Sequence, residues 1–214
     1  MGLQEFLDPP GQQLALVQHG CQGSHLDGLS GPSLHFRRFS VPPAGRQDGR
    51  MPMSETELLA LLRELDDPER LEWPLNYDRA AASLAFGRLV RRLETDFGTQ
   101  CEFEQDTQDS SEYGRVRVPA EATICGTRIV VCVSKFGSLA EVCADNPGAF
   151  LGTEEARQED ALDLSDLATV ERALSELGYV NVPEELLESD YEGPSSLEHF
   201  VARPTWWTRF FGSM

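Results

Sequence analysis

Lysine is almost missing from this sequence. Lys135 is the only lysine in 214 residues, and 18 basic residues face 36 acidic ones, which gives a formal net charge of −18. The whole excess lies in residues 53–214, because residues 1–52 hold four bases and four acids. Nucleic acids and anionic membranes are bound through clusters of basic side chains. The charge balance therefore counts against either of them as the main partner.

The sequence also lacks a long apolar run and a basic leader. Its longest β-branched stretch, Ile129–Val133, is far shorter than the roughly 18 residues of a membrane span. No basic residue precedes Arg37, whereas a secretory signal begins with basic residues. The cysteines are odd in number and mostly lie in apolar patterns, as reduced buried thiols do: Cys21, Cys101, Cys125, Cys132 and Cys143. These features predict a cytoplasmic protein that does not bind membranes.

Catalytic and cofactor motifs are missing as well. The sequence has no G-x-x-x-x-G-K or G-x-G-x-x-G phosphate loop and no G-x-S-x-G nucleophile turn. The gaps between Cys125, Cys132 and Cys143 exceed the two to four residues typical of zinc sites, and the only histidine after residue 52 is His199. We therefore predict no catalytic residue, no metal site and no cofactor.

Three polar features leave alternatives open. Asp106, Asp109 and Glu112 share a polar loop that could bind a cation, although a solvated loop is the simpler interpretation in so acidic a chain. Lys135 occupies a turn, where it contacts an anion or, more simply, solvent. The scattered carboxylates also allow a small hydrolase, which would need paired acids of shifted pKa in a pocket.

The composition divides the chain in two. The first fifty residues contain eight glycines and five prolines and no sustained periodicity, so they cannot bury enough surface to offset their ordering entropy. We predict that residues 1–52 form a disordered N-terminal extension and residues 53–214 an acidic α+β domain. One hypothesis is that the natural protein starts at Met51 or Met53, which would leave residues 1–52 outside it.

Two helices are predicted at the start of that domain. Ser54 and Glu57 form a capping-box pattern, and leucines at helical spacing follow until Asp66-Asp67-Pro68. The second helix is expected to begin near Asn76 or Asp78 and to end at Gly98, a residue typical of helix C-termini.

The middle of the chain predicts strands. Residues 101–104 and 115–118 alternate polar and apolar residues, and an antiparallel pairing sets Glu104 opposite Arg115 and Glu102 opposite Arg117. Residues 128–133 are almost all apolar, which is typical of a central strand covered on both faces. Residues 139–143 are predicted as the next strand, with a short helix as the alternative.

The last third mixes both element types. Ser165 is expected to cap a helix that ends at Gly178, followed by a strand at residues 179–182 and a helical turn at 184–187 behind Pro183. The chain then ends in an aromatic stretch, residues 205–211. The predicted fold is α+β: two N-terminal helices, an antiparallel sheet of four or five strands, and a C-terminal helix.

Acidic runs and the aromatic stretch are the candidate interaction surfaces. A negative face speeds encounter with a basic partner, although many acidic proteins are acidic only for solubility. On a helix, Trp206 lies beside Phe210 and Trp207 beside Phe211, a stripe that either docks on the protein's own core or anchors a partner. The predicted partner-binding residues are Asp106, Asp109, Glu112, Glu154, Glu155, Trp206 and Trp207.

Four stretches also carry a resemblance: Val133–Ala140, Leu177–Pro183, Asp190–Gly193 and Thr205–Phe211. Across residues 54–211 the chain resembles small acidic actinobacterial proteins, some of which look like immunity proteins paired with secreted polymorphic toxins. The resemblance implies a stoichiometric inhibitor that occludes the active site of a cognate toxin, with a basic toxin domain as partner. Its oligomeric state, monomer or dimer, stays open. The alternative is an adaptor or chaperone for a secreted effector, which would be dimeric and use the aromatic stripe as an exposed groove.

Overall fold

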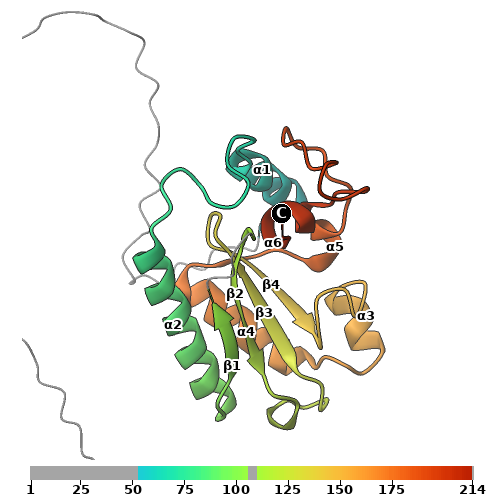
Figure 1. Ribbon diagram of the computed structural model, residues 1–214. Helices are drawn as coiled ribbons and strands as arrows, with labels where there is room; N and C mark the ends of the chain where they lie inside the picture. Colours follow the sequence, from blue (N-terminus) through green and yellow to red (C-terminus); the bar gives the residue numbers. More distant parts are fainter. Residues whose placement is uncertain (1–52, 106–109, 214) are drawn as a thin grey trace, which may run out of the picture. The chain divides into compact units, whose positions relative to one another are not determined.

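A five-stranded sheet organises the part of the chain that the computed structural model describes, residues 53–105 and 110–213 (Figure 1). The strands follow one another across the sheet in chain order: β1 (Glu102–Gln105), β2 (Glu112–Val118), β3 (Ile129–Ser134), β4 (Leu139–Ala144) and β5 (Val180–Asn181). The predicted α+β class is confirmed. The predicted extension, residues 1–52, lies outside the described residues.

The sheet is mostly rather than wholly antiparallel. The pairs β1–β2, β2–β3 and β3–β4 are antiparallel, whereas β4 and β5 are parallel. Between β4 and β5 the chain forms α3 (Thr153–Gln158) and α4 (Leu164–Leu177). A long helical crossover of this kind returns the chain in its original direction, which explains why the last pairing departs from the prediction.

β3 and β4 are buried on both faces, as predicted for a central strand. Alternate residues of β3 enter two different hydrophobic clusters: Val131 packs on one side of the sheet and Cys132 on the other. The alternative of a short helix at residues 139–143 is wrong, because this segment pairs with β3 over its length.

Two long helices cover one face of the sheet (Figure 1). They are α2 (Arg79–Phe97) and α4, and both end at a glycine in the left-handed conformation, Gly98 and Gly178, as predicted. The cap of α4 is Asp163 rather than Ser165, since the Asp163 carboxylate accepts a hydrogen bond from the Ser165 amide at 2.7 Å. An aspartate two residues upstream thus fills the place that the sequence pattern gave to the serine.

Three shorter helices cover the opposite face, gathered at one end of the strands in Figure 1. They are α1 (Glu55–Leu65), α5 (Glu184–Leu187) and α6 (Trp206–Phe211). The capping box of α1 is confirmed, because the Ser54 amide donates to Glu57 at 2.8 Å and the Glu57 amide donates to Ser54 Oγ at 3.4 Å. No helix among the described residues is both long and apolar enough to cross a membrane.

The predicted hairpin has the predicted register but different ion pairs. Glu104 lies opposite Arg115 and Glu102 opposite Arg117. The ion pairs run instead from Arg117 to Glu104, at 3.3 Å, and from Arg115 to Glu112 within β2, at 2.5 Å. All of β1 is exposed, including Phe103 at 51%, because β1 forms an edge of the sheet.

Candidate functional site

The C-terminal aromatic stripe belongs to the core. Trp206, Phe210 and Phe211 are at most 1% exposed, and the rings of Trp206 and Phe210 stack at 6.2 Å. The expectation that Trp206 is a surface anchor is therefore wrong, as is the exposed aromatic groove required of an adaptor. Trp207 is half-buried and donates its indole N–H to Glu141 at 3.0 Å.

Arg209 explains why a basic residue stands inside this stripe. Its guanidinium is fully buried and donates to Asp66 at 2.5 Å and to three backbone carbonyls, at 3.1 to 3.3 Å, in the segment that follows α1. Asp66 also accepts from the hydroxyls of Tyr191 and Ser195. The Asp66–Arg209 pair thus joins three distant segments and has a structural role.

Two polar residues expected in solvent are buried instead. Glu112 begins β2, is 3% exposed and holds Arg115, so it is not an exposed loop acid. Lys135 is also buried; its ammonium donates to the Ser110 carbonyl at 2.5 Å and lies 5.4 Å from the centre of the Trp73 ring. The solvated-turn interpretation of Lys135 is wrong. Asp106 and Asp109 lie outside the described residues.

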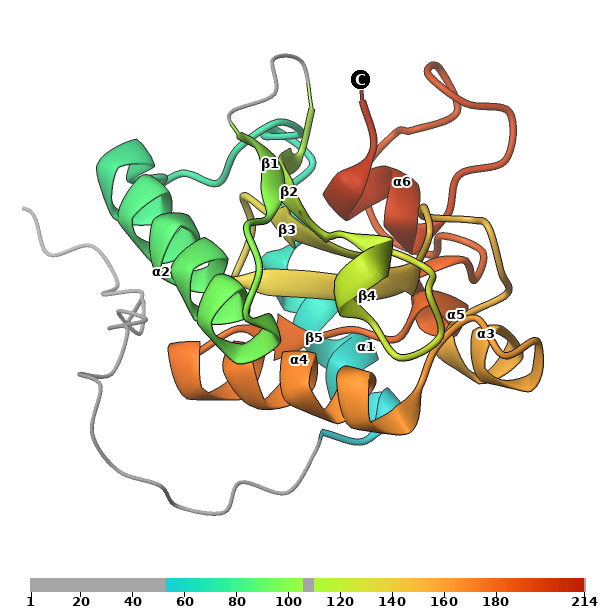
Figure 2. The ribbon, with the colours of Figure 1, turned by 90° about the horizontal axis from the view of Figure 1, so that it is seen from below.

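The remaining predicted acids belong to α3, a helix that the sequence analysis missed. Glu154 is exposed and holds Arg157 at 2.7 Å, whereas Glu155 is half-buried and accepts from the Leu151 amide. α5 lies beside this helix (Figures 1 and 2), and a methyl group on Gly152 would come within 2.1 Å of the Glu185 carboxyl group. We call the set Glu154, Glu155, Glu185 and Glu188 the α3–α5 acidic face.

A hollow of about 240 Å³ adjoins the α3–α5 acidic face. It lies between the start of α1 and α5 and shares Glu185 with that face. Apolar side chains and two carboxylates line it: Met53, Leu58, Pro183 and Leu186, with Glu55 and Glu185, and Ser189 beside them. An apolar floor beside carboxylates fits a side chain that is itself part apolar and part cationic, such as arginine or lysine.

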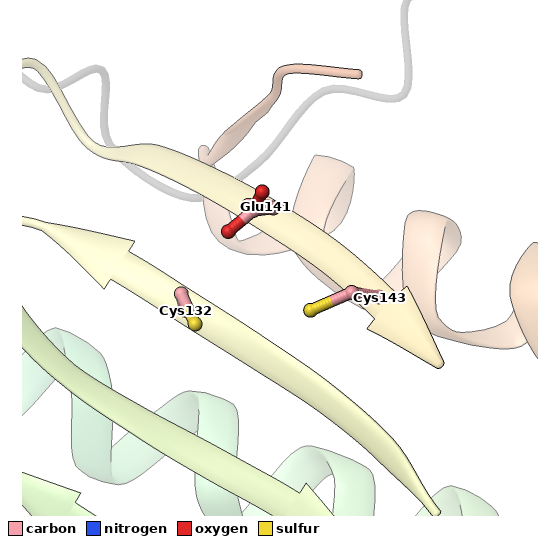
Figure 3. A group of neighbouring side chains, drawn as sticks. All are labelled: Cys132, Glu141 and Cys143. Carbon is pink, nitrogen blue, oxygen red and sulfur yellow. The ribbon is translucent and has the colours of Figure 1, made fainter. Parts of the chain in front are cut away.

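Beneath α5 and α6, the sheet carries a polar group that the sequence analysis also missed. Cys132 on β3 lies opposite Glu141 on β4, and Cys143 follows two residues later on the same side. The two sulfurs and a carboxylate oxygen lie within 4.8 Å of one another (Figure 3). All three residues are at most 1% exposed. Their spacing along the chain gave no signal because strand pairing, not sequence proximity, brings them together.

Burial dominates the electrostatics of this group. The pKa of Glu141 is raised to about 8. Burial is the largest cause, the hydrogen bond from Trp207 acts against it, and the negative charges of Glu184, Glu188 and Glu112 add to the rise. The pKa of the Cys143 thiol is also raised, by its hydrogen bond with Cys132 and by burial. In the absence of a bound cation, Glu141 is therefore largely protonated at neutral pH.

Glu184 lies at the start of α5, next to Glu185 of the α3–α5 acidic face, and its charge acts on Glu141. Its carboxylate is buried, accepts from the Gly148 amide at 2.7 Å, and has a pKa raised first by burial. The hydrolase alternative required such shifted acids in a pocket, but neither Glu141 nor Glu184 lines the hollow between α1 and α5.

Comparisons with known proteins give no assignment. No protein-family model, no curated protein and no solved structure matches the chain.

Proposed function

We propose that the chain is a non-enzymatic binding protein, an immunity protein that neutralises a basic toxin domain in the cytoplasm by covering its active site. The observation that carries the proposal is the unbalanced acidity of one part of the molecule. Residues 154–198 contain 14 acids and only two bases, Arg157 and Arg172. A protein that needs charge only for solubility gains nothing from concentrating it in this way.

The position of these acids supports a contact surface. The α3–α5 acidic face borders a hollow with an apolar floor, so a partner can place a basic side chain against Glu185 and its alkyl part against Leu58 and Leu186. A negative face also steers a basic partner during approach, and this raises association rates by about 10- to 1,000-fold at low salt.

The test is binding to any basic toxin domain encoded next to the chain's own gene, measured at low and high salt. Replacing Glu154, Glu185 and Glu188 together by lysine should slow association at least about tenfold at low salt, with a smaller effect at high salt. The matched control replaces Glu64, Glu69 and Glu121, which are also exposed and lie outside this face. It applies the same change in net charge.

Growth provides the second readout. Co-expression of the unaltered chain should protect cells from the toxin domain, and the triple variant on the α3–α5 acidic face should protect less than the control. Equal association rates for the two triple variants would remove this face from the interface. Failure of the chain to bind or protect at all would overturn the immunity function itself.

A further inference from the structure

The buried group of Cys132, Glu141 and Cys143 on β3 and β4 lowers the stability of the fold, because its polar atoms are poorly hydrogen-bonded. Glu141 Oε2 accepts from Trp207, but Glu141 Oε1 has no hydrogen-bond partner among the described residues and is buried. The Cys143 thiol has weak hydrogen-bond partners: the sulfur of Cys132 and the Val130 carbonyl oxygen, at 3.6 Å. Leaving a buried polar atom without a partner costs about 1–3 kcal/mol, so a buried glutamate at this position of β4 calls for a compensating interaction.

The distances among the two sulfurs and the carboxylate oxygen suit a small bound cation. Zinc binds thiolates at about 2.3 Å and carboxylate oxygens at about 2.0–2.2 Å, which places neighbouring ligands of a tetrahedron roughly 3.5–3.8 Å apart. The two sulfurs and the carboxylate oxygen already lie within 4.8 Å of one another, so closing the set needs movements of only about 1 Å. Figure 3 shows the three side chains approaching one another from adjacent strands.

We propose that Cys132, Glu141 and Cys143 form a buried site for one thiophilic divalent cation of the Zn²⁺ class. Thiolate sulfur selects such ions over Mg²⁺ and Ca²⁺, which prefer oxygen ligands. The Trp207 indole then orients the liganding carboxylate from behind, as hydrogen bonds to metal ligands commonly do. This inference does not depend on the proposed immunity function.

Metal binding changes protonation and charge at the site and leaves a net charge of −1 on the ion and its three ligands. On binding, both thiols and the Glu141 carboxyl group give up their protons to solvent, and no atom is oxidised or reduced. The resulting three negative charges meet the two positive charges of the ion. Arg115, which lies opposite Cys132 on β2, supplies a guanidinium beside the site, with Glu112 as its ion-pair partner.

The experiment is metal binding by the purified full chain, stripped with a chelator and refolded with Zn²⁺ because the three side chains are closed to solvent. One equivalent of Zn²⁺ should remain after desalting. Replacement by Co²⁺ should give the intense near-ultraviolet band of thiolate-to-cobalt charge transfer. Binding of Co²⁺ without that band would place the ion on surface acids and overturn the proposal, as would the absence of retained Zn²⁺.

Matched variants separate ligation from folding. Cys132→Val and Cys143→Val keep an apolar side chain on the strand and should abolish the band, whereas Cys125→Val, at a half-buried cysteine outside the group, should leave it unchanged. Glu141→Gln keeps an acceptor for Trp207 and should weaken binding at least about tenfold. Circular dichroism and urea unfolding of the metal-free variants establish that each is folded. A folded Cys132→Val variant that retains the band would refute the assignment.

Discussion

Removal of the buried Arg209 side chain should be among the most destabilising single changes in the described part of the chain. Arg209 is fully buried, pairs with Asp66 and lies 4.5 Å from the Phe136 ring centre. Arg209→Met keeps a long apolar side chain in the space but deletes the charge and all four hydrogen bonds. The substitution therefore tests the polar network rather than the packing.

The loss of stability expected for Arg209→Met depends on the polar groups that lose Arg209 as their partner. Removing one partner of a buried ion pair costs about 3–5 kcal/mol, because the other charge stays buried. Asp66 keeps its two hydroxyl donors, Tyr191 and Ser195, which lowers this cost. The three carbonyls lie in a segment that is partly exposed and can turn to water, so they add little. We expect a loss of about 3–4 kcal/mol, a large share of the 5–15 kcal/mol typical of a domain.

The assay is urea unfolding followed by tryptophan fluorescence, with Trp206 as a buried reporter. Arg203→Met is the matched control: Arg203 also pairs with an aspartate, Asp190, but the two side chains are 83% and 65% exposed. The control should cost little, because solvent screens an exposed ion pair. In a double-mutant cycle, Asp66→Asn combined with Arg209→Met should cost clearly less than the two separate losses added together. Additive losses, or a cost of Arg209→Met no larger than that of the control, would refute the structural role assigned to this pair.

Three further predictions concern other buried or capping groups. In chelator-treated protein, the pKa of Glu141 is about 8, against 4.5 in the unfolded chain, so the protonated carboxyl group contributes fully to stability below about pH 4.5. This contribution, worth up to roughly 4 kcal/mol, is lost as the pH rises to about 8. Glu141→Gln should abolish the pH dependence in unfolding measured across this range. Gly193→Ala should cost about 1–3 kcal/mol, because its methyl group would come within 2.2 Å of an Asp66 oxygen, whereas Gly87→Ala, with no atom closer than 3.6 Å, should be neutral or stabilising in the same urea assay. Ser54→Ala should lower stability by about 1 kcal/mol through loss of the α1 cap, and an unchanged urea midpoint would contradict that role.

Local signals in the sequence were enough for most elements of the fold. The capping box at Ser54 and the terminal glycines Gly98 and Gly178 mark helix ends, because a short-range hydrogen bond or a left-handed backbone defines each of them. The hairpin register followed from the alternation of charges between Glu102 and Arg117. α3 escaped because its six residues span fewer than two turns and include only one buried side chain, which leaves no periodicity to detect.

The candidate sites were harder to predict because they depend on tertiary placement. Glu112, Lys135 and Arg209 are charged, and charged residues are usually exposed, so composition alone put the first two in solvent. Each is buried beside a polar partner: an ion pair for Glu112 and for Arg209, and a backbone carbonyl for Lys135. Cys132 was correctly expected inside the apolar strand, but nothing in its neighbourhood along the chain pointed to a carboxyl group on β4.

The two buried polar groups differ in a way that bears on function. In the Asp66–Arg209 pair, every side-chain nitrogen and oxygen has a hydrogen-bond partner. The pair therefore fixes the C-terminal helix and offers no unpartnered oxygen to a ligand. Glu141 has an oxygen left over, and two thiols face the same space. The two groups are equally buried, but only the group of Cys132, Glu141 and Cys143 has atoms free to bind a ligand. If a cation occupies the group of Cys132, Glu141 and Cys143, it stabilises the strands beneath α5, the helix that contains Glu185 and is followed by Glu188. The cation then helps to hold the α3–α5 acidic face in place for a basic partner.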